Sequence, residues 1–294
     1  MNTRQPASGQ LFASRRGFLK VAAAAPFAAS AAGLHFAGAA EDQPAAEKSG
    51  KIKFHLGMAS YTLRKFKLDE TLAMTKRLGL EYICFKSFHL PLDATPQQIA
   101  DVVAKVKEAG LILYGGGVIS MRNQDQVDQA FEYAKAAGMT TIVGVPSPEL
   151  LPAVEKKVKE YDIKVAIHNH GPGDKTYPVP QAAYEKIKGL DRRIGLCNDI
   201  GHTVRYGEDL IKTTRQCADR LLDVHLKDVT AASAKGQACP AGRGVIDLPA
   251  FFKTLVEIGY SGMASLEYES DADDPLAGCA ESIGYCRGIL AMMG

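Results

Sequence analysis

The sequence predicts a single closed (β/α)₈ barrel that begins near residue 51. Eight short apolar segments alternate with eight amphipathic segments, and several amphipathic segments end on a glycine that leads directly into the next apolar run. The region 51–294 is also close to the roughly 250 residues typical of such a barrel. An open doubly wound sheet would share the local pattern, but no GxGxxG follows the first strand and eight units favour closure.

Each repeat is predicted as a strand followed by a helix. Short apolar runs predict strands at 53–59, 80–86, 111–116, 141–145, 163–168, 194–199, 221–226 and 262–267. Apolar spacings of three and four predict helices at 68–78, 96–109, 124–137, 148–161, 180–187, 208–218, 248–258 and 275–292. Glycines suited to the left-handed position after a helix follow four of them, at Gly79, Gly110, Gly138 and Gly259.

The N-terminal segment is predicted to be a twin-arginine export signal, separate from the barrel. The stretch Ser14-Arg15-Arg16-Gly17-Phe18-Leu19-Lys20 precedes an alanine-rich apolar run from Val21 to Ala32. A transmembrane anchor is the alternative, but the apolar run is short and no stop-transfer pattern follows it. We therefore expect a periplasmic or extracellular protein without a membrane anchor after cleavage.

The cleavage site sets the expected domain boundaries. Small residues at Ala37-Gly38-Ala39 fit signal cleavage, so residues 1–39 form the predicted signal. Residues 40–50 are expected to be a polar linker, and residues 51–294 the barrel.

Composition argues against several partners. The formal net charge is +2 and the basic residues are interspersed with acids, which gives no electrostatic case for nucleic acid or an anionic membrane. The sequence leaves the oligomeric state open, a homo-oligomer included.

The six cysteines are predicted to be mostly buried thiols. Cys84 and Cys197 lie in predicted strands, and Cys217 and Cys286 lie in predicted helices. Only Cys239 and Cys279 are expected where loops would let them pair.

Groups that bind divalent metals stand at the ends of four predicted strands. In strand order, the segments at these ends are His168-Asn169-His170, Asp199-Ile200-Gly201-His202, His225-Leu226-Lys227-Asp228 and Glu267. Side chains from different strands converge at the C-terminal mouth of a barrel. The sequence therefore predicts one metal centre formed by His168, Asp199, His225 and Glu267.

Each of these residues also has a structural interpretation. A single histidine at a strand end is more often structural, and an aspartate there usually caps the next helix.

Strand alternation places His168 with His170, and His225 with Lys227, on one face. An inward lysine is costly unless it meets substrate or a carboxylate. His202 is expected to contact substrate or to hold a neighbouring ligand.

Two imidazoles and two carboxylates indicate the class of metal. This mixture suits Mn²⁺, Co²⁺, Fe²⁺ or Zn²⁺ better than Mg²⁺ or Ca²⁺. Manganese is our preferred expectation, since loading inside the cell before export would be one way to fix a weakly bound ion.

From about residue 54 to its end, the chain resembles the sugar phosphate isomerase/epimerase superfamily, with its xylose isomerase-like TIM barrel. The resemblance rests on an Asp-x-x-His, a His-x-Lys-Asp and a final Glu, which match Asp199, His202, His225, Lys227, Asp228 and Glu267. It implies a metal-dependent isomerase or epimerase that works through an enediolate, with Glu267 as the first candidate base.

One position departs from the family pattern. Sugar epimerases of this family have a glutamate before the Asn-His of strand five, and this chain has His168. Loss of one carboxylate weakens the case for two-base epimerisation, so a hydratase or lyase acting on a keto-sugar or inosose is the alternative. Lys86 and His202 are the further catalytic candidates, while His89, His170 and Lys227 are candidates for substrate binding.

The expected substrate is a small unphosphorylated sugar or cyclitol, because sugar phosphates are cytoplasmic metabolites. A non-catalytic sugar-binding barrel is a second alternative. An endonuclease of the same superfamily is disfavoured, because it needs three zinc ions and more ligands than the six histidines outside the signal supply.

Overall fold

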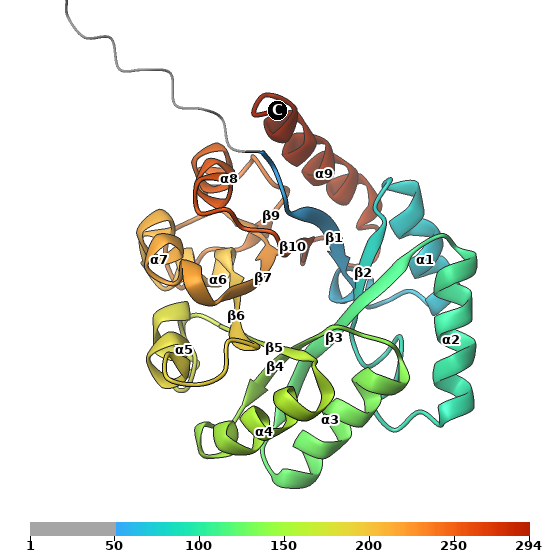
Figure 1. Ribbon diagram of the computed structural model, residues 1–294. Coiled ribbons are helices and arrows are strands. Elements are labelled where there is room, and N and C mark those ends of the chain that lie inside the picture. The colour runs from blue at the N-terminus through green and yellow to red at the C-terminus, as the bar shows by residue number, and fades with distance from the viewer. Residues whose placement is uncertain (1–50) are drawn as a thin grey trace, which may run out of the picture. The chain divides into compact units, whose positions relative to one another are not determined.

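The computed structural model describes residues 51–294, which form a closed eight-stranded parallel barrel with helices around it (Figure 1). The predicted export signal and linker lie outside the described residues. The barrel strands are β1 (His55–Ala59), β2 (Tyr82–Phe85), β3 (Ile112–Met121), β4 (Thr141–Pro146), β5 (Lys164–His168), β6 (Ile194–Asp199), β7 (Leu221–Leu226) and β10 (Met263–Leu266). Their order around the barrel is β1-β10-β7-β6-β5-β4-β3-β2, which confirms the predicted closure.

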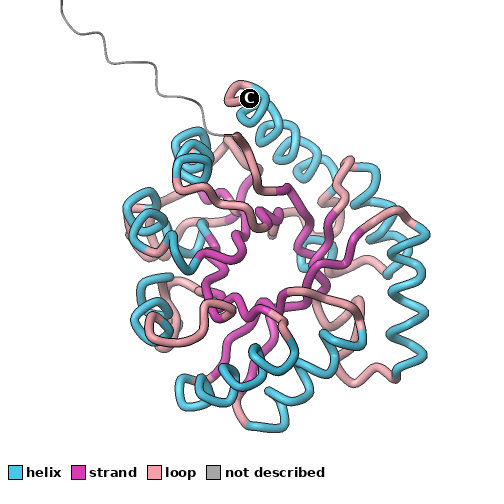
Figure 2. The backbone as a smooth tube through the Cα atoms, in the orientation of Figure 1, coloured by secondary structure: helices cyan, strands magenta, loops and turns pink. Residues whose placement is uncertain are grey.

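The strands form an inner ring and the helices an outer ring, as the tube view shows (Figure 2). The outer helices are α1 (Leu68–Arg77), α2 (Pro96–Glu108), α3 (Gln124–Ala136), α4 (Leu151–Tyr161), α5 (Pro180–Ile187), α7 (Leu210–Gln216), α8 (Leu248–Glu257) and α9 (Leu276–Ala291). Each matches a predicted helix within a few residues. Among the described residues, no helix is long and apolar enough to cross a membrane.

Four glycines terminate helices in the predicted manner. Gly79, Gly110, Gly138 and Gly259 have φ angles of 69°, 68°, 66° and 68°. Side chains rarely adopt this left-handed region, so glycine lets the chain turn sharply from each helix into the next strand.

Strand β3 is longer than predicted. Its register against β4 shifts between Gly116 and Ile119, and pairing then continues to Met121. A Cβ at Gly117 would lie 2.2 Å from the carbonyl oxygen of Val143. Only glycine permits this close approach, and the sequence pattern alone did not reveal that the strand resumes beyond it.

Several short elements were not predicted. Helix α6 (Ile200–Arg205) begins directly after β6, and a two-stranded ribbon of β8 (Asp228–Val229) and β9 (Ala238–Cys239) follows β7. Three 3₁₀ turns, η1 (Ser60–Leu63), η2 (Pro148–Leu150) and η3 (Ala218–Arg220), complete the described elements. Helix α6 and the ribbon both adjoin strand ends that carry site residues.

Two apolar clusters stabilise the fold. The larger lies between the barrel and its helices, where Phe251, Phe252 and Leu255 of α8 are fully buried. The smaller contains Cys84, Tyr114, Val143, Ala166 and Cys197. Its residues come from five neighbouring strands, which places it inside the barrel.

All six cysteines are free, and all lie within the described residues. Cys84, Cys197, Cys217 and Cys286 are buried, as predicted. Cys279 lies within α9 and is buried, so the expectation of a loop position was wrong and it does not pair with Cys239.

Candidate metal centre

The four predicted ligands lie together at the C-terminal end of the barrel. His168 and Asp199 end β5 and β6, His225 lies near the end of β7, and Glu267 follows β10. These strands are neighbours in the barrel, and all four side chains are buried. One ligand atom from each lies within 4.8 Å of the others. The four are therefore close enough to share one ion.

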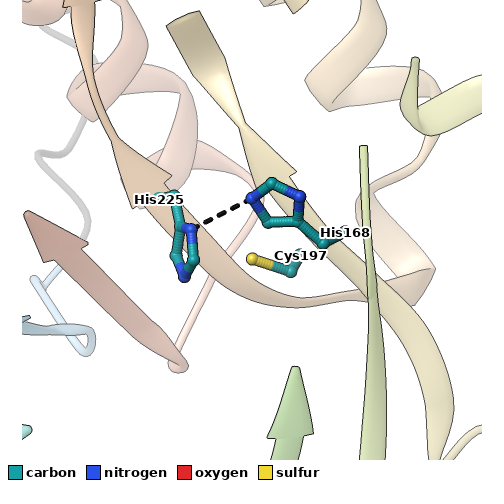
Figure 3. Close-up of side chains that lie close together, drawn as sticks. All are labelled: His168, Cys197 and His225. Atoms are coloured by element: carbon teal, nitrogen blue, oxygen red, sulfur yellow. Dashed lines mark hydrogen bonds between the residues drawn. The ribbon is translucent and has the colours of Figure 1, made fainter. Parts of the chain in front are cut away.

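The donor atoms converge pairwise. His168 Nε2 lies 3.1 Å from His225 Nδ1 (Figure 3) and 3.5 Å from Asp199 Oδ2. His225 Nδ1 lies 3.3 Å from Glu267 Oε2. The two ring nitrogens share a hydrogen bond, and together with two carboxylate oxygens they surround the same small volume. This donor set fits a divalent ion of the first transition series.

Asp199 has two roles at once. Its Oδ1 accepts the backbone N–H of His202 at 2.8 Å and so caps α6, while its Oδ2 faces His168. The cap is observed, and it leaves Oδ2 available for the predicted metal contact. The cap fixes the carboxylate, so its second oxygen is held toward the centre.

Asn169 ties the ends of β5 and β6 together. Its side-chain oxygen accepts the N–H of Asp199 at 3.0 Å, and its amide nitrogen donates to the Thr203 hydroxyl at 3.1 Å. The sequence pattern marked Asn169 only as the residue between two histidines. Its bracing role depends on the neighbouring strand and could not be read from its own segment.

Lys227 forms a buried ion-pair network with three carboxylates. Its Nζ lies 2.9 Å from Asp199 Oδ2, 3.0 Å from Glu267 Oε2 and 3.0 Å from Glu269 Oε1. Burial alone would lower the pKa of Lys227, but the three carboxylates outweigh it and raise the pKa well above its usual value. Lys227 therefore stays charged, and these three carboxylates offset its cost of burial. The expected partner, Asp228, instead accepts the backbone N–H groups of Val229 and Gly242.

The protonation states of three of the four proposed ligands favour metal binding at neutral pH. Burial lowers the pKa of His168 to about 3, so its ring is neutral. Burial opposes ionisation of Asp199 and Glu267, but neighbouring cationic groups, Lys227 among them, hold both pKa values well below the usual range. His225 is the exception: although burial acts in the opposite direction, the Glu267 carboxylate raises the pKa of His225, so this ring must release a proton before it binds a metal.

Two further histidines lie beside the centre. The His170 ring centroid is 4.6 Å from that of His168, and the His202 centroid is 6.0 Å from it. His170 is partly exposed and its Nδ1 lies 3.3 Å from Asp174 Oδ2. His202 Nε2 lies 3.9 Å from Asp199 Oδ2, and burial lowers the pKa of His202. Both rings stand where a bound molecule could meet them.

A polar cavity of about 320 Å³ adjoins His170. Residues at the ends of β3 and β4 and in the segments after β3, β4 and β5 line it, among them Ser120, Arg122, Ser147, His170, Asp174 and Thr176. Its volume lies within the range of small-molecule sites, and its hydroxyl, imidazole and guanidinium groups can all bond sugar oxygens.

Lys86 and His89 lie after β2 and are held by protein contacts. Lys86 Nζ donates to the Val118 carbonyl at 2.7 Å, and burial lowers the pKa of Lys86. His89 is buried, with Nδ1 2.9 Å from Ser60 Oγ and Nε2 3.0 Å from Thr71 Oγ1. Because both ring nitrogens of His89 already have partners, a substrate contact by His89 would need the ring to move, and it stays a prediction.

Cys197 is a neighbour of the centre that the sequence analysis treated only as a buried thiol. It precedes Asp199 by two residues on β6 and so shares its inward face. A donor atom from each of Cys197, His168 and His225 lies within 4.8 Å of the other two (Figure 3). Strand alternation contained this signal, since every second residue before a ligand points into the same interior.

Comparisons with known proteins identify the family of the barrel. The family model described as a xylose isomerase-like TIM barrel matches residues 59–289. The chain is similar to an inosose dehydratase from Clostridium tetani, with 31% identity over 132 residues that cover 40% of this chain and 44% of the relative. It is also similar to an L-ribulose-5-phosphate 3-epimerase from Escherichia coli, with 30% identity over 97 residues that cover 33% of this chain and 34% of the relative.

The chain thus matches less than half the length of these two relatives. Among solved structures, an uncharacterised protein from Parabacteroides distasonis superposes with a TM-score of 0.65 at 26% identity. That match covers 81% of this chain and 99% of the other.

Proposed function

The chain belongs to the xylose isomerase-like TIM barrel family, and we propose that it is a divalent-metal-dependent isomerase or epimerase acting on an unphosphorylated keto-sugar or cyclitol. One observation carries the proposal: two imidazoles and two carboxylates converge within 4.8 Å at the catalytic mouth of the barrel. The inosose dehydratase and the ribulose-phosphate epimerase named above support a sugar or cyclitol substrate.

His168, Asp199, His225 and Glu267 would hold the metal, for which manganese is our first choice and cobalt, iron and zinc are alternatives. Such an ion supplies electrophilic stabilisation to a carbonyl and an adjacent hydroxyl while the neighbouring carbon loses its proton. The polar cavity beside His170 leaves room for the rest of the substrate.

Glu267 is the proposed base. Lys227 and His225 keep its carboxyl ionised at neutral pH, so the carboxylate can accept a proton from the substrate carbon. Its burial excludes bulk water from that transfer. Lys86 and His202 are the candidates that return a proton, because burial lowers the pKa of each and so weakens its hold on a proton.

Dehydration is the alternative reaction. It needs a base on the carbon and an acid of a different kind on the departing hydroxyl. The chain has His168 where family epimerases have a second glutamate, and the rings of His170 and His202 stand beside it. This observation and the inosose dehydratase relative favour the same alternative.

Hydrogen exchange tests the proposal. The metal-loaded protein is incubated in deuterated buffer with 3-keto sugars and inososes, and proton NMR follows the hydrogen next to the carbonyl. We expect exchange in the native protein and a loss of about 100-fold or more in Glu267→Gln. Glu281→Gln, which alters an exposed partner of Arg243, is the matched control. A native protein that binds these sugars without exchange or water loss would instead be a sugar-binding barrel.

We also propose that the protein is exported by the twin-arginine route. The motif around Arg15 and Arg16 supports this. Replacing both arginines with lysine should retain the protein in the cytoplasm, as cell fractionation would show.

A further inference from the structure

The two histidines of the proposed metal centre belong to a second, overlapping donor set. Cys197 is buried on β6, and its sulfur points toward the rings of His168 and His225 (Figure 3). One donor atom from each of the three residues lies within 4.8 Å of the other two. This second set combines the two histidine nitrogens with a sulfur. The first set combines the same two histidines with the oxygens of Asp199 and Glu267.

We propose that the centre has a deeper binding mode, in which a thiophilic ion such as zinc is held by His168, Cys197 and His225. Sulfur ligands select soft or borderline ions, whereas carboxylates suit manganese. Because both modes use the same histidines, one excludes the other. The deeper mode therefore blocks loading of the metal that the proposed sugar chemistry needs.

The position of Lys227 favours this mode for a thiophilic ion. Lys227 already forms ion pairs with both carboxylates, at 2.9 Å from Asp199 and 3.0 Å from Glu267. An ion held by the thiol and the imidazoles leaves these ion pairs intact, whereas an ion in the carboxylate set shares both oxygens with the ammonium group. When the thiophilic ion binds, a metal–sulfur bond replaces the S–H bond and the proton passes to solvent, with no change in oxidation state.

The surroundings of Cys197 are mostly apolar, apart from the buried carboxylate of Asp223, its register partner on β7. Its apolar cluster includes Val143 and Ala166, and the Tyr114 hydroxyl in that cluster already bonds Ser265 at 2.7 Å. The cluster also contains Cys84, a second buried thiol that lies outside the donor set. Cys84 is therefore a matched control for Cys197.

Cobalt titration of the chelator-treated full-length protein tests the proposal without any sugar. We expect the native protein and Cys84→Ser to develop a near-ultraviolet sulfur-to-cobalt charge-transfer band, and Cys197→Ser to lack it. Zinc affinity should fall about tenfold or more in Cys197→Ser, which shifts the zinc-to-manganese affinity ratio toward manganese.

Asp199→Asn is the complementary test, because it weakens the donor set that contains the carboxylates and keeps the donor set of His168, Cys197 and His225. This variant should retain the cobalt–sulfur band while its manganese affinity falls. Absence of the band in the native protein, or equal zinc affinity in native protein and Cys197→Ser, would overturn the proposal. Neither result bears on hydrogen exchange at Glu267, so the proposed function is judged separately.

Discussion

The ammonium group of Lys227 lies 2.9 Å from Oδ2 of Asp199, the same carboxylate oxygen that faces His168 at 3.5 Å. Lys227 also lies 3.0 Å from Oε2 of Glu267, which in turn faces His225. One buried cation therefore contacts both carboxylates of the proposed centre. Its charge stabilises the centre without metal and opposes the positive charge of an arriving ion.

Replacing Lys227 with methionine should separate these two effects. Removing one partner of a buried ion-pair network leaves charges uncompensated, so we expect the metal-free protein to lose about 3–5 kcal/mol of unfolding free energy. Metal affinity should rise, because the repulsion between ammonium and ion is gone. Urea denaturation and calorimetric metal titration measure the two changes.

Lys65→Met is the control for the Lys227 experiment, because Lys65 pairs with Asp273 on the surface. We expect it to alter neither quantity appreciably. A Lys227→Met protein as stable as the native one would contradict the assigned network.

Gly201→Ala should disturb Lys227 through space. A Cβ at position 201 would lie 2.7 Å from Cγ and 3.0 Å from Cβ of Lys227. These atoms lie close to the Lys227 backbone, so they cannot move away without shifting the whole side chain. We expect weaker ion pairs and a lower melting temperature of the metal-free protein. Gly284→Ala in α9 controls for the loss of a helical glycine, because nothing lies within 4 Å of its Cβ position.

His168→Glu should change the reaction more than the metal content. The variant restores a carboxylate where family epimerases have one, so an ion should remain bound while epimerisation gains over water loss. Elemental analysis measures the metal and NMR identifies the products. Unchanged products and unchanged metal affinity together would remove His168 from the centre.

The metal-free protein should lose stability in acid partly through His168. Burial lowers the pKa of His168 from 6.5 to about 3, so between these values the unfolded chain binds a proton that the folded chain does not. The free energy of unfolding therefore falls as pH falls through this window. The raised pKa of His225 acts above pH 6.5 and in the opposite direction, so the two windows do not overlap.

Denaturation at several pH values between 4 and 7, compared between native protein and His168→Gln, measures this effect. The substitution should reduce the slope of stability against pH. An equal slope in both proteins would mean that His168 is not buried in its neutral form.

The sequence by itself determined the barrel and the residues that could form its centre. Alternation of apolar segments reports which face of each element is buried, and glycines such as Gly79 mark where helices must turn. Because all eight strands are parallel, their C-terminal ends meet at one mouth, and this placed His168, Asp199, His225 and Glu267 near one another before any distance was known.

Only the tertiary structure decided how those residues share their contacts. Asp199 caps α6 and faces the centre, Lys227 joins three carboxylates, and Cys197 lies beside both histidines. Two of the unpredicted details, the resumption of β3 after Gly117 and the enclosure of His89 by Ser60 and Thr71, arise between elements far apart in sequence. Periodicity fixes the direction of a side chain within its own segment, whereas register and barrel closure fix its distance from every other segment.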